Sequence, residues 1–158
     1  MTDIPIRPFT ARDARFVISL AARFADFDLP EWRRRNEIED FFRNRLRKAV
    51  EHSEHDEAIF IAEDESGEPM GFVHVQSEAD HFTGEKHGFI PELAVASSCE
   101  GRGVGQRLLE AAEGWARERG HDVVALCVFD GNLRARHIYE KHGFVPELVW
   151  YAKRVPPK

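Results

Sequence analysis

Hydrophobic positions in the first third of the chain recur at the spacing of amphipathic helices. After a short strand over Ile4–Arg7, Thr10 and Asp13 form a candidate capping box, and a helix to about Phe24 is predicted. A second helix is predicted over Ile38–His52, with apolar residues on one face and many arginines on the other. We expect that arginine face to be solvated.

The rest of the chain alternates between apolar runs that predict strands and two further helical patterns. The strands are expected at Ala58–Glu63, Met70–Gln76, His87–Val95, Val123–Phe129 and Leu148–Arg154, and the helices at Gly103–Arg119 and Asn132–His142. The run Val123–Phe129 lacks alternation, which predicts a central strand covered on both faces, with Cys127 in the core. Helices interleaved with strands late in the chain predict a mixed α/β sheet in a single domain, residues 1–158.

A glycine-rich loop joins one of these strands to the helix that follows it. Gly101, Gly103 and Gly105 alternate with other residues directly before the helix begins. Glycines let a ligand approach the main chain, and the first turn of a helix offers free N–H groups and a positive dipole end. The spacing is not the Gly-x-Gly-x-x-Gly of dinucleotide-binding folds, and Gly105-Gln106-Arg107 does not supply the ending of a kinase-type phosphate loop. The loop therefore predicts a site for a phosphorylated small molecule.

Composition restricts the partners of this site. The 158 residues are 42% hydrophobic and 32% charged, with a formal net charge of −6, so nucleic acid is not expected as a partner. The two cysteines, Cys99 and Cys127, match no zinc-binding spacing, and we expect reduced thiols and no metal. No apolar run approaches the roughly 20 residues that span a bilayer, and Met1–Pro5 does not resemble the start of a signal peptide. We therefore expect a cytoplasmic protein that does not bind membranes.

A second pattern lies downstream of the glycine loop, from Asn132 through Tyr139 to Gly143-Phe144. Together the two closely resemble the GNAT superfamily of acetyl-CoA-dependent N-acetyltransferases, in element order along nearly the whole chain and in motifs from Glu92 to Phe144. The resemblance implies an α/β fold with a mixed, mostly antiparallel sheet. That sheet would be splayed between strands 4 and 5 and flanked by about four helices.

The same resemblance implies roles for individual residues, with acetyl-CoA as cosubstrate. The backbone of Leu93, Ala94 and Val95 would pair with the pantetheine arm, and the N–H groups of Glu100, Gly101, Arg102, Gly103, Val104 and Gly105 would cradle the pyrophosphate. Asn132 would hydrogen-bond the cofactor or hold the strand end beside it, and Tyr139 would protonate the leaving thiolate.

Glu100 departs from the family pattern, which usually has Arg or Gln at this position. A carboxylate near phosphates costs about 1 kcal/mol at 4 Å where the solvent screens the interaction. Arg102 and Arg107 supply positive charge nearby. We expect weaker binding of CoA at most.

The reaction requires a proton acceptor, because an amine attacks a thioester only as the free base. Glu92 is the first candidate, since it lies on the strand that would hold the thioester. The secondary candidates precede it: Asp80, His81, Glu85 and His87.

A small-molecule amine is the expected acceptor, with Ala25–Asn36 and Ser77–Lys86 as the segments that would shape its pocket. A protein lysine or N-terminus is the second choice. A non-catalytic acyl-CoA-binding regulatory module is the alternative from another class; it could dispense with Glu92 and Tyr139, which are both present. A homodimer through the apolar residues of Leu148–Tyr151 is a further expectation.

Overall fold

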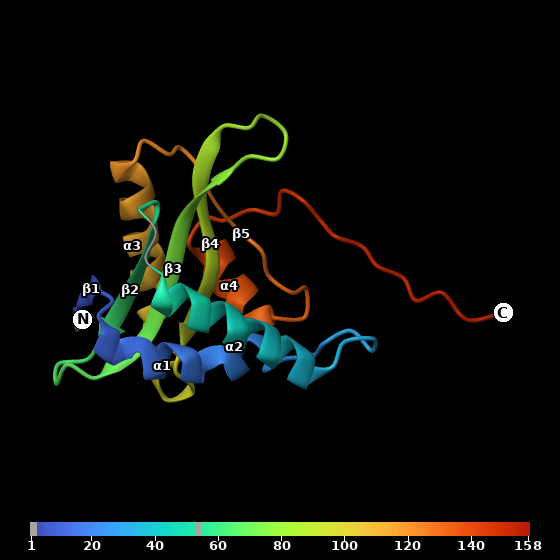
Figure 1. Ribbon diagram of the computed structural model, residues 1–158, viewed down its shortest axis with the longest axis horizontal. Coiled ribbons are helices and arrows are strands. Elements are labelled where there is room, and N and C mark those ends of the chain that lie inside the picture. Colours follow the sequence, from blue (N-terminus) through green and yellow to red (C-terminus); the bar gives the residue numbers. More distant parts are fainter. Residues whose placement is uncertain (1–2, 53–54) are drawn as a thin grey trace.

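The computed structural model describes residues 3–52 and 55–158. Met1 and Thr2, which belong to the N-terminal segment that does not resemble a signal peptide, lie outside the described residues. In the described part, five strands form one sheet in the order β1-β2-β3-β4-β5 (Figure 1). The strands are β1 (Ile6–Pro8), β2 (Glu57–Glu63), β3 (Pro69–Ala79), β4 (Lys86–Val95) and β5 (Val124–Leu126). The α-helices are α1 (Ala14–Ser19), α2 (Arg35–Glu51), α3 (Val104–Glu118) and α4 (Leu133–Lys141), with 3-10 turns η1 (Ala11–Asp13), η2 (Leu20–Ala25) and η3 (Ser97–Cys99).

Helices cover both faces of the sheet, as the apolar stripes predict. On one face, α1, η2 and α2 pack against Ile61, Phe72 and Ala94. On the other, the buried stripe of α3 packs against Val73 and Val75 of the same strands. The first four strands are antiparallel and β4 pairs with β5 in parallel, so the predicted mixed sheet is confirmed.

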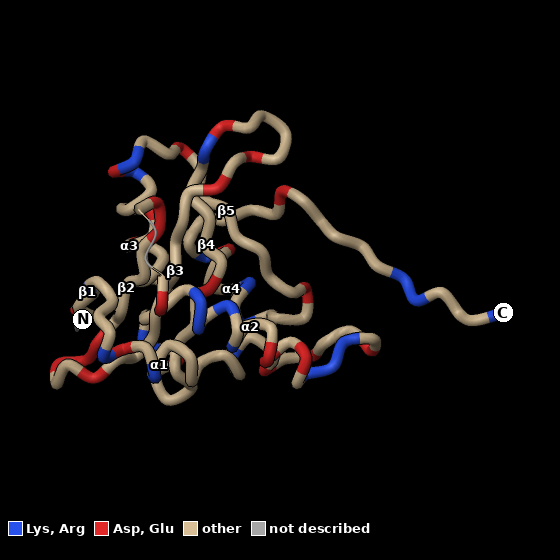
Figure 2. The backbone as a smooth tube through the Cα atoms, in the orientation of Figure 1, with Lys and Arg blue, Asp and Glu red and all other residues tan. Residues whose placement is uncertain are grey.

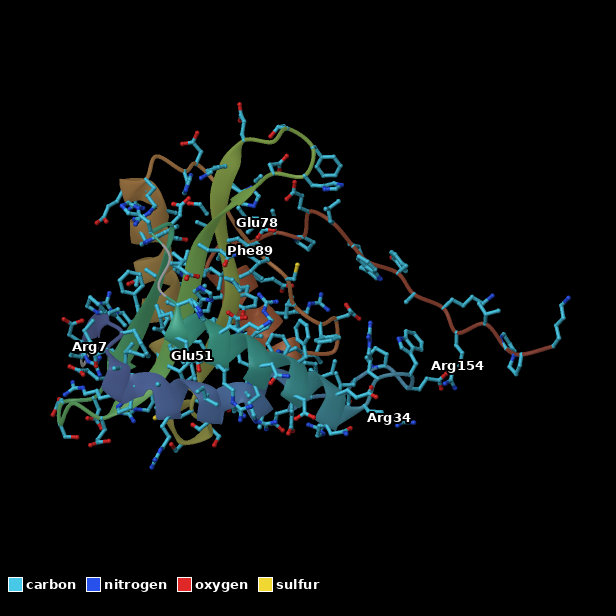
Figure 3. The ribbon with its side chains drawn as sticks, viewed as in Figure 1. Arg7, Arg34, Glu51, Glu78, Phe89 and Arg154 are labelled. Carbon is cyan, nitrogen blue, oxygen red and sulfur yellow. The ribbon has the colours of Figure 1, made fainter. Side chains whose placement is uncertain are left out.

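Two predictions for the last third of the chain were wrong. The run Val123–Phe129 forms only the short edge strand β5, and Cys127 is exposed rather than in the core. The segment Leu148–Arg154 is not a strand, although its apolar pattern suits one. Residues 145–158 instead extend away from the body (Figure 1), as the backbone tube also shows (Figure 2), and their side chains, among them the labelled Arg154 (Figure 3), are exposed. The outer edge of β5 is not paired by any described residue, so the apolar pattern of this run does not by itself decide whether it joins the sheet.

The residues described contain no helix that is both long and apolar enough to cross a membrane.

An irregularity in the pairing of β3 with β4 determines the geometry around it. His74 pairs with Glu92, but Gln76 pairs with Phe89, so the two residues Ile90–Pro91 lie opposite a single residue of β3. This is a β-bulge, a feature that bends a strand and redirects its side chains. Proline suits the position because it has no N–H to donate to the ladder.

The bulge changes which face of the sheet each β4 residue meets. Ile90 packs into the cluster beneath α3. Two and four residues later, Glu92 contacts Arg45 of α2 and Ala94 packs beneath α1 and α2. Without the extra residue, strict alternation would put all three on one face. The bulge therefore directs the Glu92 side chain toward α2.

The pairing of β4 with β5 ends at the same place. The register runs from Gly88 with Val124 to Ile90 with Leu126 and goes no further. Beyond it, the two strands separate, and among the described residues no strand lies beside the last residues of β4 on that side. The splay expected between strands 4 and 5 is confirmed.

A buried carboxylate ties the N-terminal elements to the sheet. Both oxygens of Asp13 accept hydrogen bonds from Arg7, each at 2.8 Å, and Oδ2 also accepts from the Thr10 N–H, which confirms the capping box. Arg7 also donates to Glu63 at 2.6 Å. The Arg7 hydrogen bonds are the main reason that the pKa of Asp13 is lowered to about 2.

Replacing Asp13 by Asn should lower the free energy of unfolding by ~2 kcal/mol at pH 7, because charge-assisted hydrogen bonds to Arg7 are lost. The pKa of Asp13 is lower in the fold than in the unfolded chain, so its contribution is present above about pH 4 and is lost as the pH falls toward 2. The gap between the wild type and D13N should therefore narrow over that range in urea titrations. Asp40→Asn, at an exposed pair with Arg43, is the control and should change stability by under about 1 kcal/mol. A gap that stays constant with pH would contradict this account.

Candidate active site

A cavity of about 460 Å³ occupies the space where β4 and β5 separate. Ile90–Val95, except for Glu92, forms one wall, and Cys127–Phe129 forms another. All but one of the residues predicted to bind the cofactor line this cavity: Leu93, Ala94, Val95, Glu100, Gly101, Gly103, Val104, Gly105 and Asn132. The exception is Arg102. The sequence-predicted set therefore comes together around one cavity.

The glycine loop closes one end of this cavity. Gly101 and Gly103 have φ angles of 73° and 81°, in the left-handed region that side chains other than glycine rarely adopt. With these angles the chain turns sharply, and α3 begins at Val104 beside the cavity. The unpaired N–H groups of its first turn and its positive dipole end therefore lie next to the cavity, an arrangement that favours an anion.

Glu100 is not an isolated negative charge in this loop. It forms ion pairs with Arg23 of η2 and, at 3.0 Å, with Arg134 of α4. Arg23 also donates from Nε to the carbonyl oxygen of Val95, at the end of β4, at 3.1 Å. Both arginines line the cavity, so two guanidinium groups converge where the loop could hold phosphates.

α4 contributes two of the predicted residues. Asn132 caps the helix, since its Oδ1 accepts a hydrogen bond from the Ala135 N–H at 3.2 Å, and it also lines the cavity. Tyr139, further along α4, also lines the cavity, and its ring centroid lies 5.9 Å from that of Phe144. Burial raises the pKa of Tyr139 to about 12, so its hydroxyl keeps its proton at neutral pH.

Glu92 lies on the other side of β4 from this cavity. It is only 2% exposed, and its Oε1 forms an ion pair with Nε of Arg45, in α2, at 2.9 Å. Its Oε2 lies 2.7 Å from Nδ1 of His74, in β3. Glu92 lines a second cavity of about 470 Å³ beneath α2, whereas Tyr139 lines the first.

His74 joins Glu92 to a further carboxylate. Its Nε2 lies 2.7 Å from Oε2 of Glu57, at the start of β2. Burial alone would lower the pKa of His74, but the hydrogen bonds and charges of Glu92 and Glu57 together raise it above its usual 6.5. Glu57, His74 and Glu92 thus form a continuous chain of titratable groups at the second cavity.

Several contributors were not predicted from the sequence. Arg45 belongs to the arginine face of α2 that was expected to be solvated, and it instead pairs with a buried acid. His74 interrupts the apolar residues of a buried strand, which was a usable signal of a buried polar contact. The secondary base candidates Asp80, His81, Glu85 and His87 line neither cavity. Asp80 accepts hydrogen bonds from the Phe82 and Thr83 N–H groups, so it shapes its own turn.

Comparison with known sequences identifies relatives of the chain. The model of the acetyltransferase (GNAT) family matches residues 20–144. The uncharacterized N-acetyltransferase YhfO of Bacillus subtilis is 28% identical over 158 residues, which cover 97% of this chain and 99% of the relative. A mycothiol acetyltransferase of Propionibacterium freudenreichii is 37% identical over 102 residues, 63% of this chain; the match spans only 32% of that longer protein. An aminoglycoside N(6')-acetyltransferase of Stenotrophomonas maltophilia is 32% identical over 105 residues, 63% of this chain and 69% of the relative.

Solved structures share the fold at low sequence identity. A tetramutant protein from Bacillus halodurans superposes with a TM-score of 0.78 and 20% identity, covering 96% of this chain and 99% of its own. AAC(6')-Iy, solved in complex with the bisubstrate analogue CoA-S-monomethyl-acetylneamine, gives a TM-score of 0.69 and 19% identity, covering 98% of this chain and 100% of its own.

The ion pairs of Glu100 generate a prediction for CoA. Replacing Glu100 by Gln removes the carboxylate that Arg23 and Arg134 share, so CoA should bind about fivefold more tightly, the equivalent of about 1 kcal/mol of screened repulsion. Isothermal titration calorimetry at low and high salt measures this gain, which should shrink as salt increases. Glu110→Gln, which releases Arg107 outside the cavity lining, is the matched control. Weaker CoA binding by E100Q would mean that Glu100 is needed to position the arginines.

Proposed function

The chain belongs to the acetyltransferase (GNAT) family, and from this premise we propose that it transfers the acetyl group of acetyl-CoA directly to the primary amine of a small molecule. The observation that carries the proposal is the cavity between the splayed strands, which is closed by the glycine loop and lined by Tyr139. Such a cavity suits a thioester on a long pantetheine arm that is joined at its other end to a pyrophosphate.

The donor would lie along β4. The backbone of Leu93–Val95 has no strand beside it on the cavity side and would pair with the amide groups of the pantetheine arm. The pyrophosphate would accept hydrogen bonds from the N–H groups of residues 100–105, near Arg23 and Arg134. The thioester would then lie close to the bulge at Ile90–Pro91, which lines the same cavity.

The acceptor must lose a proton before it reacts. A lysine-like amine with a pKa of about 10.4 is only roughly 0.1% neutral at pH 7.4, so the site needs a proton acceptor. We assign that role to Glu92, whose two oxygens each retain a lone pair after the contacts with Arg45 and His74. The amine nitrogen would form its bond to the carbonyl carbon as the carbon–sulfur bond breaks.

Tyr139 is the proposed acid for the departing thiolate. With a pKa of about 12, its hydroxyl is protonated throughout the working range and would donate a hydrogen bond, and then its proton, as charge develops on sulfur. Tyr139 is half-buried in the wall of the first cavity, so the hydroxyl would act at the edge of the space proposed for the thioester.

Small amines are the proposed acceptor class. Relatives named as aminoglycoside and mycothiol acetyltransferases act, by their names, on small molecules. The net charge of −6 also favours cationic acceptors. A protein acceptor and a non-catalytic CoA-binding module are the alternatives that the experiment must separate.

A panel of amines tests the proposal by release of free thiol from acetyl-CoA. Turnover of small amines supports it, whereas turnover of peptides alone would favour a protein acceptor. Tight CoA binding without turnover of any amine or peptide would favour the binding module and contradict an enzyme.

Tyr139→Phe tests the acid within the same assay. We expect kcat to fall about 100-fold, because a positioned proton donor is lost, while the affinity for CoA changes little. Tyr151→Phe is the matched control, since Tyr151 lies exposed on the C-terminal segment and outside both cavities. Unchanged turnover and an unchanged pH profile in Y139F would overturn the assignment.

We further propose a homodimer that works in the cytoplasm. Trp150 and Tyr151 are 93% and 89% exposed on an extended segment, and β5 has no partner strand on its outer side, so each copy could supply what the other lacks. Light scattering should report a dimer that deletion of residues 146–158 converts to a monomer; a full-length monomer would contradict it.

The cysteines, Cys99 and Cys127, are free thiols, in keeping with a reducing compartment.

A further inference from the structure

The three-residue chain at the second cavity has a proton requirement that follows from its geometry. Both ring nitrogens of His74 lie 2.7 Å from a carboxylate oxygen, one on Glu92 and one on Glu57. A ring nitrogen without hydrogen would point its lone pair at an anion, so each short contact calls for one proton. The fully bonded chain therefore holds two protons on three groups, with His74 as imidazolium.

Loss of one proton leaves one of the two contacts without a hydrogen. The three groups can then accept one proton, and His74 binds that proton strongly because two carboxylates face its ring. The other charged or titratable groups that line this cavity are Arg45 and Lys48 of α2 and His52, the residue directly after that helix. Arg45 neutralises one carboxylate through Oε1 of Glu92 and leaves Oε2 to His74.

The two ends of the Glu57–His74–Glu92 chain differ in their access to water. Glu92 belongs to β4, the strand whose backbone would hold the thioester, and its side chain is almost fully buried. Glu57 is more exposed, with 16% of its side chain accessible at the start of β2. Both line the second cavity together with His74. A proton received at the buried end can therefore leave at the exposed end.

We propose that His74 and Glu57 extend Glu92 into a proton relay, which takes the proton of the acceptor ammonium and releases it to water at the second cavity. This inference rests on the proposed function. Glu92 would be the group that meets the acceptor, and His74 and Glu57 are positioning residues that act through it.

The relay balances one proton per acetyl transfer. An N–H bond of the ammonium breaks, its electron pair stays on nitrogen, and the proton passes to Glu92 and on to Nδ1 of His74. The imidazolium so formed gives its Nε2 proton to Glu57, which releases it to water. The ring then carries hydrogen on Nδ1 only, so before the next transfer Nε2 regains a proton from water through Glu57 and Nδ1 returns one to water through Glu92. The active form before each transfer is the one in which His74 is neutral, so kcat should rise with pH as His74 loses its extra proton.

The substitution Glu57→Gln tests the relay by the direction in which it shifts the pKa of His74. Removing one of the two carboxylates should lower the pKa of His74 by about one unit, because less negative charge stabilises the imidazolium. The ring titration measured by NMR and the acid limb of the kcat profile should then both move to lower pH by the same amount. Glu63→Gln is the matched control: Glu63 is the last residue of β2, is similarly exposed and is paired with Arg7 outside the relay.

His74→Gln provides the second test. Its kcat should fall by about tenfold or more, the acid limb assigned to His74 should disappear, and CoA affinity should not change. Thermal unfolding of both variants separates lost folding from lost relay. An E57Q acid limb that stays in place, or a loss of kcat that is equal at every pH, would overturn the relay. If wild type acetylates no amine, the proposed function fails instead, while the NMR titration still reports on the chain of contacts.

Discussion

The bulge at Ile90–Pro91 is the constraint on which the rest of the site depends. One extra residue in β4 ends the pairing with β5 and opens the first cavity. The same residue sends Glu92 toward α2 while Leu93–Val95 keep their backbone against the opened space. Under the proposed function, the strand whose backbone holds the donor thereby also carries the proposed base, Glu92. A regular β4 would bury Glu92 under α3, among apolar residues that could not pair with its charge.

Charge is compensated locally on both sides of that strand. At the loop, Arg23 and Arg134 neutralise Glu100, and Arg23 also reaches the end of β4, so the loop is tied to the strand before any ligand arrives. Beneath α2, Arg45 and His74 do the same for Glu92. A buried carboxylate such as Glu92 is costly unless it is paired and hydrogen-bonded, and both Glu92 and the more exposed Glu100 have at least two cationic or hydrogen-bonding partners.

The sequence predicts what is encoded locally and misses what depends on distant contacts. The glycine loop, the Thr10–Asp13 capping box and the helix starting at Asn132 depend on neighbours a few residues apart, and all three are found where expected. The Glu57–His74–Glu92 chain joins residues 17 and 18 positions apart across two strand pairs, and it depends on a bulge that Pro91 alone hints at. The arginine face of α2 gave no sign of which side chain meets a buried acid. Apolar runs near the C-terminus misled for a related reason, since a strand requires a partner that the pattern does not name.

The separation of the two cavities has an evolutionary consequence. Lys48, Ala49 and His52 line the second cavity and do not line the first. They lie near the end of α2, one side of which faces the solvent, so their replacement would leave the apolar anchor Leu46 and strand β4 intact. Under the proposed function, mutations there would reshape the cavity around Glu92 while the residues proposed to hold the donor are inherited unchanged. A chain built in this way would then acquire new acceptors in single steps without passing through a form that has lost its cosubstrate.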